Sequence, residues 1–181
     1  MTSSKSERDY SESGLTIQEA LLQKYEGVRS ARDPSRETPW VKWAGRQVHA
    51  SDRVAVPQTC RIALDLLSVR PNGRHGVDLK AYGGRLILAD GTAIGTLRTW
   101  SDTKFEDHLE YPVHSRDGYL GTWNVYELPT KAGPVVEFWT GNAGMWIERD
   151  GTSSTYHCSA GLSEAPDFED LIYRVSILPS T

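Results

Sequence analysis

The sequence predicts an all-β fold, an antiparallel up-and-down β-barrel of eight or nine strands, with one short N-terminal amphipathic helix. Three observations predict it. Apolar residues alternate with period two from about residue 46 onward, short turn signals separate the alternating segments, and only one segment has helical periodicity. Segments without intervening helices should pair with their neighbours. A barrel is preferred to a two-sheet sandwich because the strand spacing is near-uniform and no long crossover is evident.

The 181 residues fit a single domain. We expect a flexible polar arm over residues 1–15, a helix over 16–27, a linker over 28–45 and the barrel over 46–181. The linker assignment follows from a run rich in Arg, Ser and Pro that has no periodicity.

The helix is predicted by a capping box, in which Thr16 and Glu19 exchange hydrogen bonds, and Gly27 supplies a stop signal. One face of this helix is apolar and carries Ile17, Leu21, Tyr25 and Val28. A helix this short is not stable alone, so its apolar face must pack against another part of the protein. It could close the barrel mouth as a lid formed by Ile17, Leu21 and Tyr25, or pack permanently on the barrel wall or at a homodimer contact. If it is a lid, removal of residues 1–27 should leave a folded barrel with much reduced turnover.

The strands are predicted by alternating segments and by turns between them. Turn signals are Pro71-Asn72-Gly73, Asp117-Gly118 and Asp150-Gly151, and Asp90-Gly91 predicts a hairpin. The alternating segments are residues 60–67, 77–82, 85–88, 93–100, 108–115, 119–128, 134–141, 145–151, 155–161 and 171–178.

Composition excludes several function classes. A net charge of -4 argues against nucleic-acid binding, which requires a basic surface. The longest apolar runs are a few residues, so no helix should span a membrane, and no apolar export signal begins the chain. We therefore expect a cytoplasmic protein in which Cys60 and Cys158 are buried thiols rather than a disulfide.

No motif for a cofactor, metal or covalent nucleophile is evident. The five histidines lack metal-ligand spacing, and there is no G-x-S-x-G sequence. The glycine clusters at residues 83–84 and 141–144 lie within β pattern and open no helix, so they indicate bulges or tight corners rather than a phosphate site. We expect no cofactor and no metal.

The remaining signal is aromatic. The chain has six Trp but only three Phe, and four of the Trp fall between residues 100 and 146. Any one of these side chains could simply fill a core, but the group predicts a cavity that is apolar and able to form hydrogen bonds. The expected cavity wall is Trp100, Trp123, Trp139, Met145 and Trp146. Which face of segment 119–128 points inward is left open by the alternation.

A ligand in such a cavity also needs polar anchors. The candidates are Gln47, Tyr126, Glu137 and His157, with His49 and Asn124 as further possibilities. No acid–base or nucleophilic catalytic residue is predicted.

This layout resembles the small β-barrel [4+2] cyclases of bacterial polyketide pathways, the spirotetramate and spirotetronate cyclases. The resemblance covers the polar arm, the short helix and Trp-rich segments such as GTWNVYEL and EFWTGNAGMWIERDG. It implies a cofactor-independent intramolecular [4+2] cycloaddition on a linear, apolar polyketide-derived tetramate or tetronate in antibiotic biosynthesis. Holding diene and dienophile face to face can lower a barrier by about 7–11 kcal/mol, and hydrogen bonds to the head group would polarise the dienophile.

Three other functions fit the same residues. The first is a lipocalin-like carrier that binds an apolar molecule and leaves it unchanged. The second is an isomerase similar to allene oxide cyclase. The third is a structural or interaction protein whose aromatic residues form a core.

Overall fold

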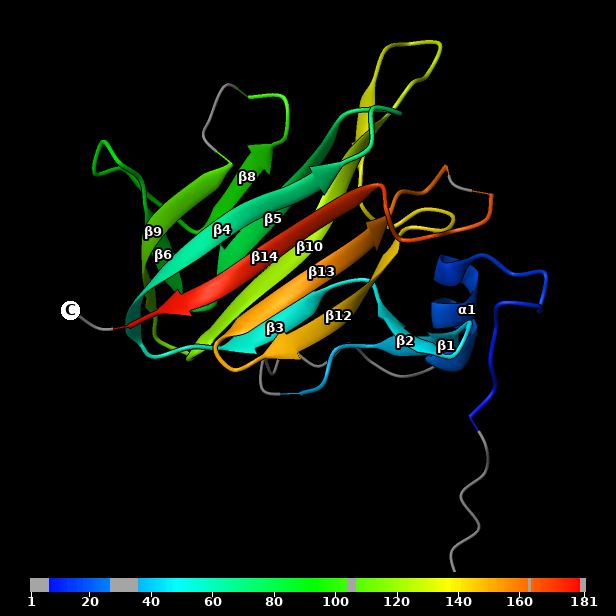
Figure 1. Cartoon of the computed structure of the whole chain (residues 1–181), viewed down its shortest axis with the longest axis horizontal. Coiled ribbons are helices and arrows are strands. Elements are labelled where there is room, and N and C mark those ends of the chain that lie inside the picture. Colours follow the sequence, from blue (N-terminus) through cyan, green and yellow to red (C-terminus); the bar gives the residue numbers. More distant parts are fainter. Residues whose placement is uncertain (1–6, 27–35, 104–106, 163, 180–181) are drawn as a thin grey trace, which may run out of the picture.

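The described part of the chain folds as an antiparallel all-β domain with one short helix (Figure 1). The computed structural model describes residues 7–26, 36–103, 107–162 and 164–179. The elements are α1 (Ile17–Lys24), β1 (Trp40–Trp43), β2 (Arg46–His49), β3 (Asp52–Ala55), β4 (Thr59–Val69), β5 (His75–Ala81), β6 (Gly84–Ile87), β7 (Ala93–Ile94), β8 (Thr96–Trp100), β9 (His108–Ser115), β10 (Tyr119–Leu128), β11 (Val135–Glu137), β12 (Gly144–Asp150), β13 (Ser153–Ser159) and β14 (Leu171–Leu178).

The strands form two sheets. One has nine strands in the order β1-β2-β12-β13-β14-β4-β9-β6-β7. The other has the order β11-β10-β5-β8, with β3 also paired to β10. In Figure 1, β4, β14, β13 and β12 cross the front of the molecule, and β5 and β10 lie behind them. The all-β class, the antiparallel pairing and the single helix are therefore confirmed.

The order of the strands differs from the expected up-and-down order. In the nine-stranded sheet β14 pairs with β4, β4 with β9, and β9 with β6, so these neighbours in the sheet are distant in the sequence, whereas β1–β2, β12–β13, β13–β14 and β6–β7 are pairs of consecutive strands. Sequential pairing is only a tendency, and alternation identifies a strand without naming its partner. The hairpin at Asp90-Gly91 does form, between β6 and β7, with Gly91 at a positive φ of 85°.

A packed core joins the two sheets. Tyr156 and Tyr173 of the large sheet are fully buried and stack with ring centroids 4.7 Å apart. The hydroxyl of Tyr173 bonds Thr122 of β10 at 2.9 Å, which links the sheets. On β10, Leu120, Thr122, Asn124 and Tyr126 are buried on the face toward the large sheet; Leu120 belongs to this core, and Tyr126 to a small cluster with Ala143 and Ala160. That result settles the register left open by the sequence: Trp123 lies on the outer face.

The N-terminal region is structured over more of its length than expected. The capping box of Thr16 and Glu19 is confirmed, but α1 ends at Lys24 and Tyr25 caps it. Gly27 and Val28 lie outside the described residues. Strand β1 falls inside the segment expected to be a linker, because its four residues are too few to show a period.

The described part of the arm makes specific contacts. The carboxylate of Asp9 accepts hydrogen bonds from the backbone N–H groups of Ala44 at 3.0 Å and Gly45 at 2.8 Å. Partial burial opposes ionisation, but these bonds and those from Ser11 lower the pKa of Asp9 to about 2. Tyr10 is buried and its backbone N–H bonds Lys42. Asp9 and Tyr10 are therefore held against the β1–β2 hairpin.

A second, smaller core lies under the helix. Ile17 and Leu21 are buried against it, and α1 packs on β1. Its members are Tyr10, Ile17, Ala20, Leu21, Val41, Trp43, Val48, Ala50 and Phe168, with Leu15, Tyr25 and Trp146 at its margin. No helix among the described residues is both long enough and apolar enough to cross a membrane.

Candidate functional site

A cleft of about 350 Å³ opens where the two sheets approach each other. It lies between β2 and β12 of the large sheet and β3 and β10 of the small one. We call it the His49 cleft. It is lined by Arg36, Glu37, Thr38, Gln47, His49, Asp52, Arg53, Tyr119, Ile147 and Arg149.

Strand β12 brings Arg149 to the cleft. Met145 is buried in the core, Ile147 is half-buried and Arg149 is exposed, so alternate residues of the strand run from the interior to the opening. The side chain of Arg149 is 52% exposed. Its long stem can therefore lie along the strand while the guanidinium reaches the cleft.

A buried carboxylate fixes that guanidinium. Asp52 is only 3% exposed, and its two oxygens accept from Arg149 Nη2 and from the Tyr156 hydroxyl, both at 2.8 Å. Arg149 Nη1 also donates to Ser154 Oγ at 2.7 Å. Burial, together with the charge of Asp52, raises the pKa of Tyr156 well above its ordinary value. The phenol therefore stays protonated and donates to Asp52.

His49 lies beside this network at the end of β2. It is buried, and its Nδ1 is 3.1 Å from Thr38 Oγ1. Burial lowers the pKa of His49 below its ordinary 6.5, and the positive charge of Arg149 acts in the same direction, while Asp52 acts against it. His49 is therefore a neutral imidazole at pH 7.

Only one of the four predicted polar anchors lines this cleft. Gln47 does so from β2. Tyr126 lines a second cavity of about 110 Å³ and bonds Thr140 Oγ1 at 2.7 Å, and burial raises its pKa. Glu137 pairs with Tyr126 in the β10–β11 register but lines neither cavity. His157 stacks on Trp146 with ring centroids 3.9 Å apart, on the outer face of the large sheet.

The predicted aromatic wall is not assembled around one cavity. Met145 is part of the core, and Trp146 lies on the outer face of the large sheet. Trp100 and Trp123 lie on the outer face of the small sheet, and Trp139 is 52% exposed. None of the five lines the His49 cleft or the second cavity. Asn124, the other polar candidate, is buried and donates to the Ser159 carbonyl.

The helix residues do not line the cleft either. Ile17 and Leu21 are buried in the second core, and Tyr25 is half-buried at its margin. The backbone N–H of Ile17 donates to Asn142 Oδ1 at 3.1 Å, and Gln18 Nε2 donates to the Ala143 carbonyl at 2.7 Å. These contacts fit a helix packed on the β-domain better than a lid over this opening.

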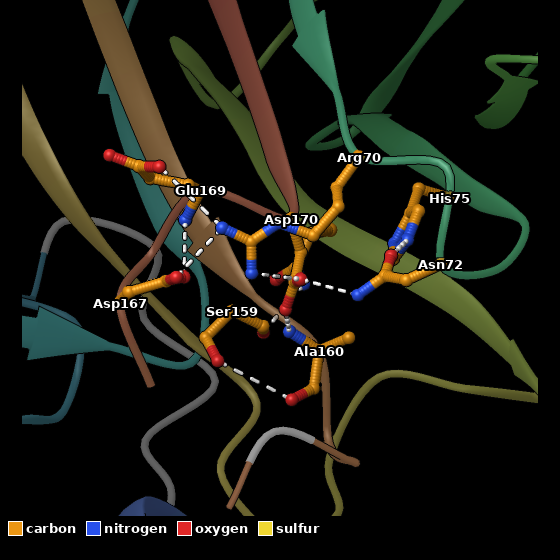
Figure 2. A network of polar contacts seen from close by, with 9 residues as sticks. Arg70, Asn72, His75, Ser159, Ala160, Asp167, Glu169 and Asp170 are labelled. Carbon is orange, nitrogen blue, oxygen red and sulfur yellow. Dashed lines mark hydrogen bonds and ion pairs between the residues drawn. The ribbon is translucent and has the colours of Figure 1, made fainter. Parts of the chain in front are cut away.

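A separate polar network adjoins the second cavity (Figure 2). The buried carboxylate of Asp170 accepts from the Ala160 backbone at 2.8 Å and from Asn72 Nδ2 at 2.8 Å. Arg70 reaches the same carboxylate and also Asp167. His75 Nε2 lies 2.8 Å from Asn72 Oδ1. The network ties the turn at Asn72 to the segment before β14, so its evident role is structural.

No local sequence pattern marks Asp52, Thr38 or Arg149 as site residues. Asp52 begins a four-residue strand and Arg149 precedes the Asp150-Gly151 turn, which are ordinary positions for exposed polar residues. Among the described residues, no three His, Cys, Asp or Glu side chains are grouped to hold a metal ion. Comparison with protein-family models and with curated proteins finds no match to this chain.

Two buried histidines predict how stability depends on pH. Burial is the main cause that lowers the pKa of His49 and of His75 from the ordinary 6.5. Below pH 6.5 the unfolded chain binds protons at these positions that the folded chain does not, so the free energy of unfolding should fall as the pH drops. His108 acts in the opposite direction, because bonds to Asp65 and Glu110 raise its pKa, but it is exposed and its effect is small.

Urea unfolding between about pH 5 and 7.5 measures this slope. His49→Gln and His75→Gln should each make it shallower. His108→Gln, a change at the exposed histidine whose pKa is raised, is the control and should not make the slope shallower. A slope that neither of the first two variants alters would contradict the prediction.

Proposed function

We propose that this chain binds a small molecule with an anionic head group in the His49 cleft. The volume of about 350 Å³ is within the range of small-molecule sites. The observation that carries the proposal is the Arg149–Asp52–Tyr156 network, which holds a half-exposed guanidinium in a fixed position at the cleft.

The charge of the cleft supports an anion. Three arginines (Arg36, Arg53 and Arg149) face two carboxylates (Glu37 and Asp52), while the whole chain carries a net charge of -4. Both oxygens of Asp52 already accept hydrogen bonds. The residues that line the cleft therefore carry more positive than negative charge, although the chain as a whole is negative, and this favours a negatively charged ligand.

The other lining groups would complete recognition of such a ligand. Gln47 can supply a neutral donor, the half-buried Ile147 offers an apolar wall, and the neutral His49 adds a polar group without a charge. A planar oxyanion with an apolar body, such as a carboxylate or the enolate of a cyclic 1,3-dicarbonyl compound, matches this set.

Isothermal titration calorimetry with tetronic acid and with its uncharged methyl ether tests the proposal. We expect tetronic acid to bind more tightly than the ether. Arg149→Met should weaken tetronic acid binding by about tenfold or more.

Arg61→Met is the matched control, because the Arg61 side chain is 51% exposed and pairs with Glu110 outside the cleft. Because Arg149→Met leaves Asp52 without its cation, Gln47→Ala serves as a second cleft variant that keeps the ion pair. Equal binding of ether and acid, or equal loss in the Arg61 variant, would contradict the proposal.

The [4+2] cyclase implied by the family resemblance is a second candidate. The observation that favours it is the pairing of a fixed cation with a neutral imidazole, since a cycloaddition needs its carbonyl polarised and no proton moved. In this version the tetramate or tetronate head of a linear polyketide-derived substrate would bind at Arg149. A cytoplasmic location belongs to the same proposal, and the free thiols of Cys60 and Cys158 support it.

Incubation with a linear polyene tetramate separates catalyst from carrier. Loss of the diene absorbance with formation of a product of unchanged mass would support the cyclase, and the reaction should slow in Arg149→Met. Recovery of the bound compound unchanged after long incubation would identify a carrier. Neither result affects the binding test above.

A further inference from the structure

The two nitrogens of the His49 ring have different surroundings. Nδ1 lies 3.1 Å from Thr38 Oγ1, inside the structure. Nε2 makes no hydrogen bond to any described residue, and it retains access to solvent. His49 is only 8% exposed and lines the cleft, so this nitrogen is an unpaired polar atom on a side chain that is otherwise buried. Such an atom is costly unless a ligand or a water molecule bonds it.

Strand β2 turns the ring toward the cleft. Val48 is completely buried in the second core under the helix, and Gln47 and His49 on either side of it line the cleft. Because neighbouring side chains of a strand point to opposite faces, His49 lies on the face away from the helix. His49 also pairs with Met145 of β12, which belongs to the main core. The strand therefore holds the imidazole at the inner end of the cleft.

Thr38 sets the tautomer of this ring. Burial is the main cause that lowers the pKa of His49, while a hydrogen bond between the ring and the Thr38 backbone raises it. A hydrogen bond raises the pKa of an imidazole when the ring donates it, and a backbone carbonyl can only accept. Nδ1 is the nitrogen at Thr38, so it carries the proton of the neutral ring. Nε2 then has a free lone pair, which makes it an acceptor.

The other lining groups with acceptor oxygens are engaged or open to water. The three arginines of the cleft can only donate. Both oxygens of Asp52 already accept hydrogen bonds, and Thr38 Oγ1 lies at His49 Nδ1. Three further lining side chains with oxygen acceptors are at least partly exposed: Glu37, Gln47 and Tyr119. Among the described residues, His49 Nε2 is therefore the acceptor on a buried lining side chain that a ligand can satisfy.

We propose that His49 Nε2 accepts a hydrogen bond from the bound ligand, so that the cleft selects anions that also carry an O–H or N–H donor. This inference rests on the proposed function, because it takes the anionic group to be held at Arg149. A ligand with the charge but without the donor leaves the lone pair unpaired, and a site built in this way discriminates against it. The ligand class is therefore a hydroxylated organic acid, or an acid with an N–H group, on an apolar body.

The positions of His49 and Asp52 limit the distance between the two groups of the ligand. His49 ends β2 in the large sheet, and Asp52, which holds Arg149, begins β3 in the small one. Three residues of chain span at most about 10 Å. The acidic group and the donor therefore fit on one small molecule, such as an acid with a single hydroxylated ring.

Matched pairs of hydroxy acids and methyl ethers test the inference. Isothermal titration calorimetry is carried out at about pH 7.5, where the His49 ring is neutral. The probes are mandelate, 3-hydroxyphenylacetate and 4-hydroxyphenylacetate, in which the hydroxyl lies progressively farther from the carboxylate, each with its methyl ether. We expect at least one hydroxy acid to bind about tenfold more tightly than its ether.

The outcomes separate this inference from the anion site on which it rests. Equal binding within every pair, or no binding of any hydroxy acid, would overturn this inference while tetronic acid binding still supports the anion site. The uncharged methyl ester of each hydroxy acid tests the anion site itself. An ester that binds as tightly as its acid would overturn the anion site, and this inference with it.

Variants of His49 show whether the imidazole causes the preference. Asn places its polar atoms near the position of Nδ1 and has none at Nε2, whereas Gln reaches the position of Nε2. His49→Asn should therefore abolish the preference for the hydroxy acid, and His49→Gln should retain most of it. His157→Asn is the matched control, since His157 lies on the outer face of the large sheet. A preference that survives in His49→Asn would overturn the inference, because the ether would then be excluded by its size alone.

Nitrogen–proton correlation spectra of the wild-type ring provide a test that needs no stable variant. The ring signals of His49 are assigned through its own backbone. We expect a protonated Nδ1 and an unprotonated Nε2 in the free chain, and a shift of Nε2 when the preferred hydroxy acid binds but not when its ether binds. A protonated Nε2 in the free chain would overturn the inference, because that nitrogen would then donate rather than accept.

Discussion

Replacing Asp52 with alanine is expected to lower the free energy of unfolding by about 3 kcal/mol. The change leaves the hydroxyl of Tyr156, which is fully buried, without its acceptor at 2.8 Å. It also removes the partner of Arg149, although that side chain is half exposed and can recover hydration. The loss should therefore fall at the lower end of the range for a broken buried pair. The hydrogen bond between Asp52 of β3 and Tyr156 of β13 also joins the two sheets, so its loss should weaken the packing of one sheet on the other.

Urea unfolding of three variants measures this effect. Asp102→Ala is the matched control, because Asp102 also pairs with an arginine but is 56% exposed, and it should cost less than about 1 kcal/mol. Asp52→Asn keeps an acceptor but removes the charge, and it should fall between the two. If Asp52→Ala cost no more than the control, the network would not organise the cleft, and the proposed anion site would lose its basis.

Ile17→Ala is expected to cost about 2–5 kcal/mol of unfolding free energy. Ile17 is completely buried in the second core. A Cβ added to Gly144 would lie only 3.1 Å from Ile17 Cγ2, so the helix packs closely against the start of β12. The shortened side chain would leave a cavity between α1 and the β1–β2 hairpin. Chemical unfolding followed by far-ultraviolet circular dichroism measures the loss.

Leu22→Ala is the control on the same helix, because Leu22 is 70% exposed and its loss should change stability by less than about 0.5 kcal/mol. The comparison also tests the lid hypothesis. A helix that opens and closes freely would contribute little to global stability, and Ile17→Ala would then resemble Leu22→Ala. A large difference means that the helix is part of the folded domain.

Local sequence signals predicted local structure well. The capping box at Thr16 is present, and the alternating segments 108–115 and 119–128 coincide with β9 and β10. These signals work because each depends on residues within a few positions of one another. Strand β1 was not predicted, because its four residues are too few to show the alternation of apolar and polar positions.

Features that depend on distant residues could not be predicted in this way. Alternation shows that Trp123 and Asn124 face opposite ways, but only the contact between Thr122 and Tyr173 shows which way is inward. Likewise Asp52 and Arg149 are separated by 97 residues, and no nearby residue in the sequence indicates that either belongs to a site. The cluster of Trp in the sequence predicted one cavity wall, but Trp100 and Trp123 lie on the outer face of the small sheet and Trp146 on that of the large sheet.

The docking of the helix has a consequence for biosynthesis. Ile17 is synthesised early, yet Asn142, whose side-chain Oδ1 accepts from the Ile17 backbone N–H, follows 125 residues later. At about 5–20 residues per second, the first turn of the nascent helix would wait for about 6–25 s before Asn142 is synthesised, although the β1–β2 hairpin that covers its apolar face follows soon after the helix. Phe168, the last member of the same core, comes later still. During that interval the backbone N–H of Ile17 lacks its acceptor, and slower translation before residue 142 would lengthen the interval.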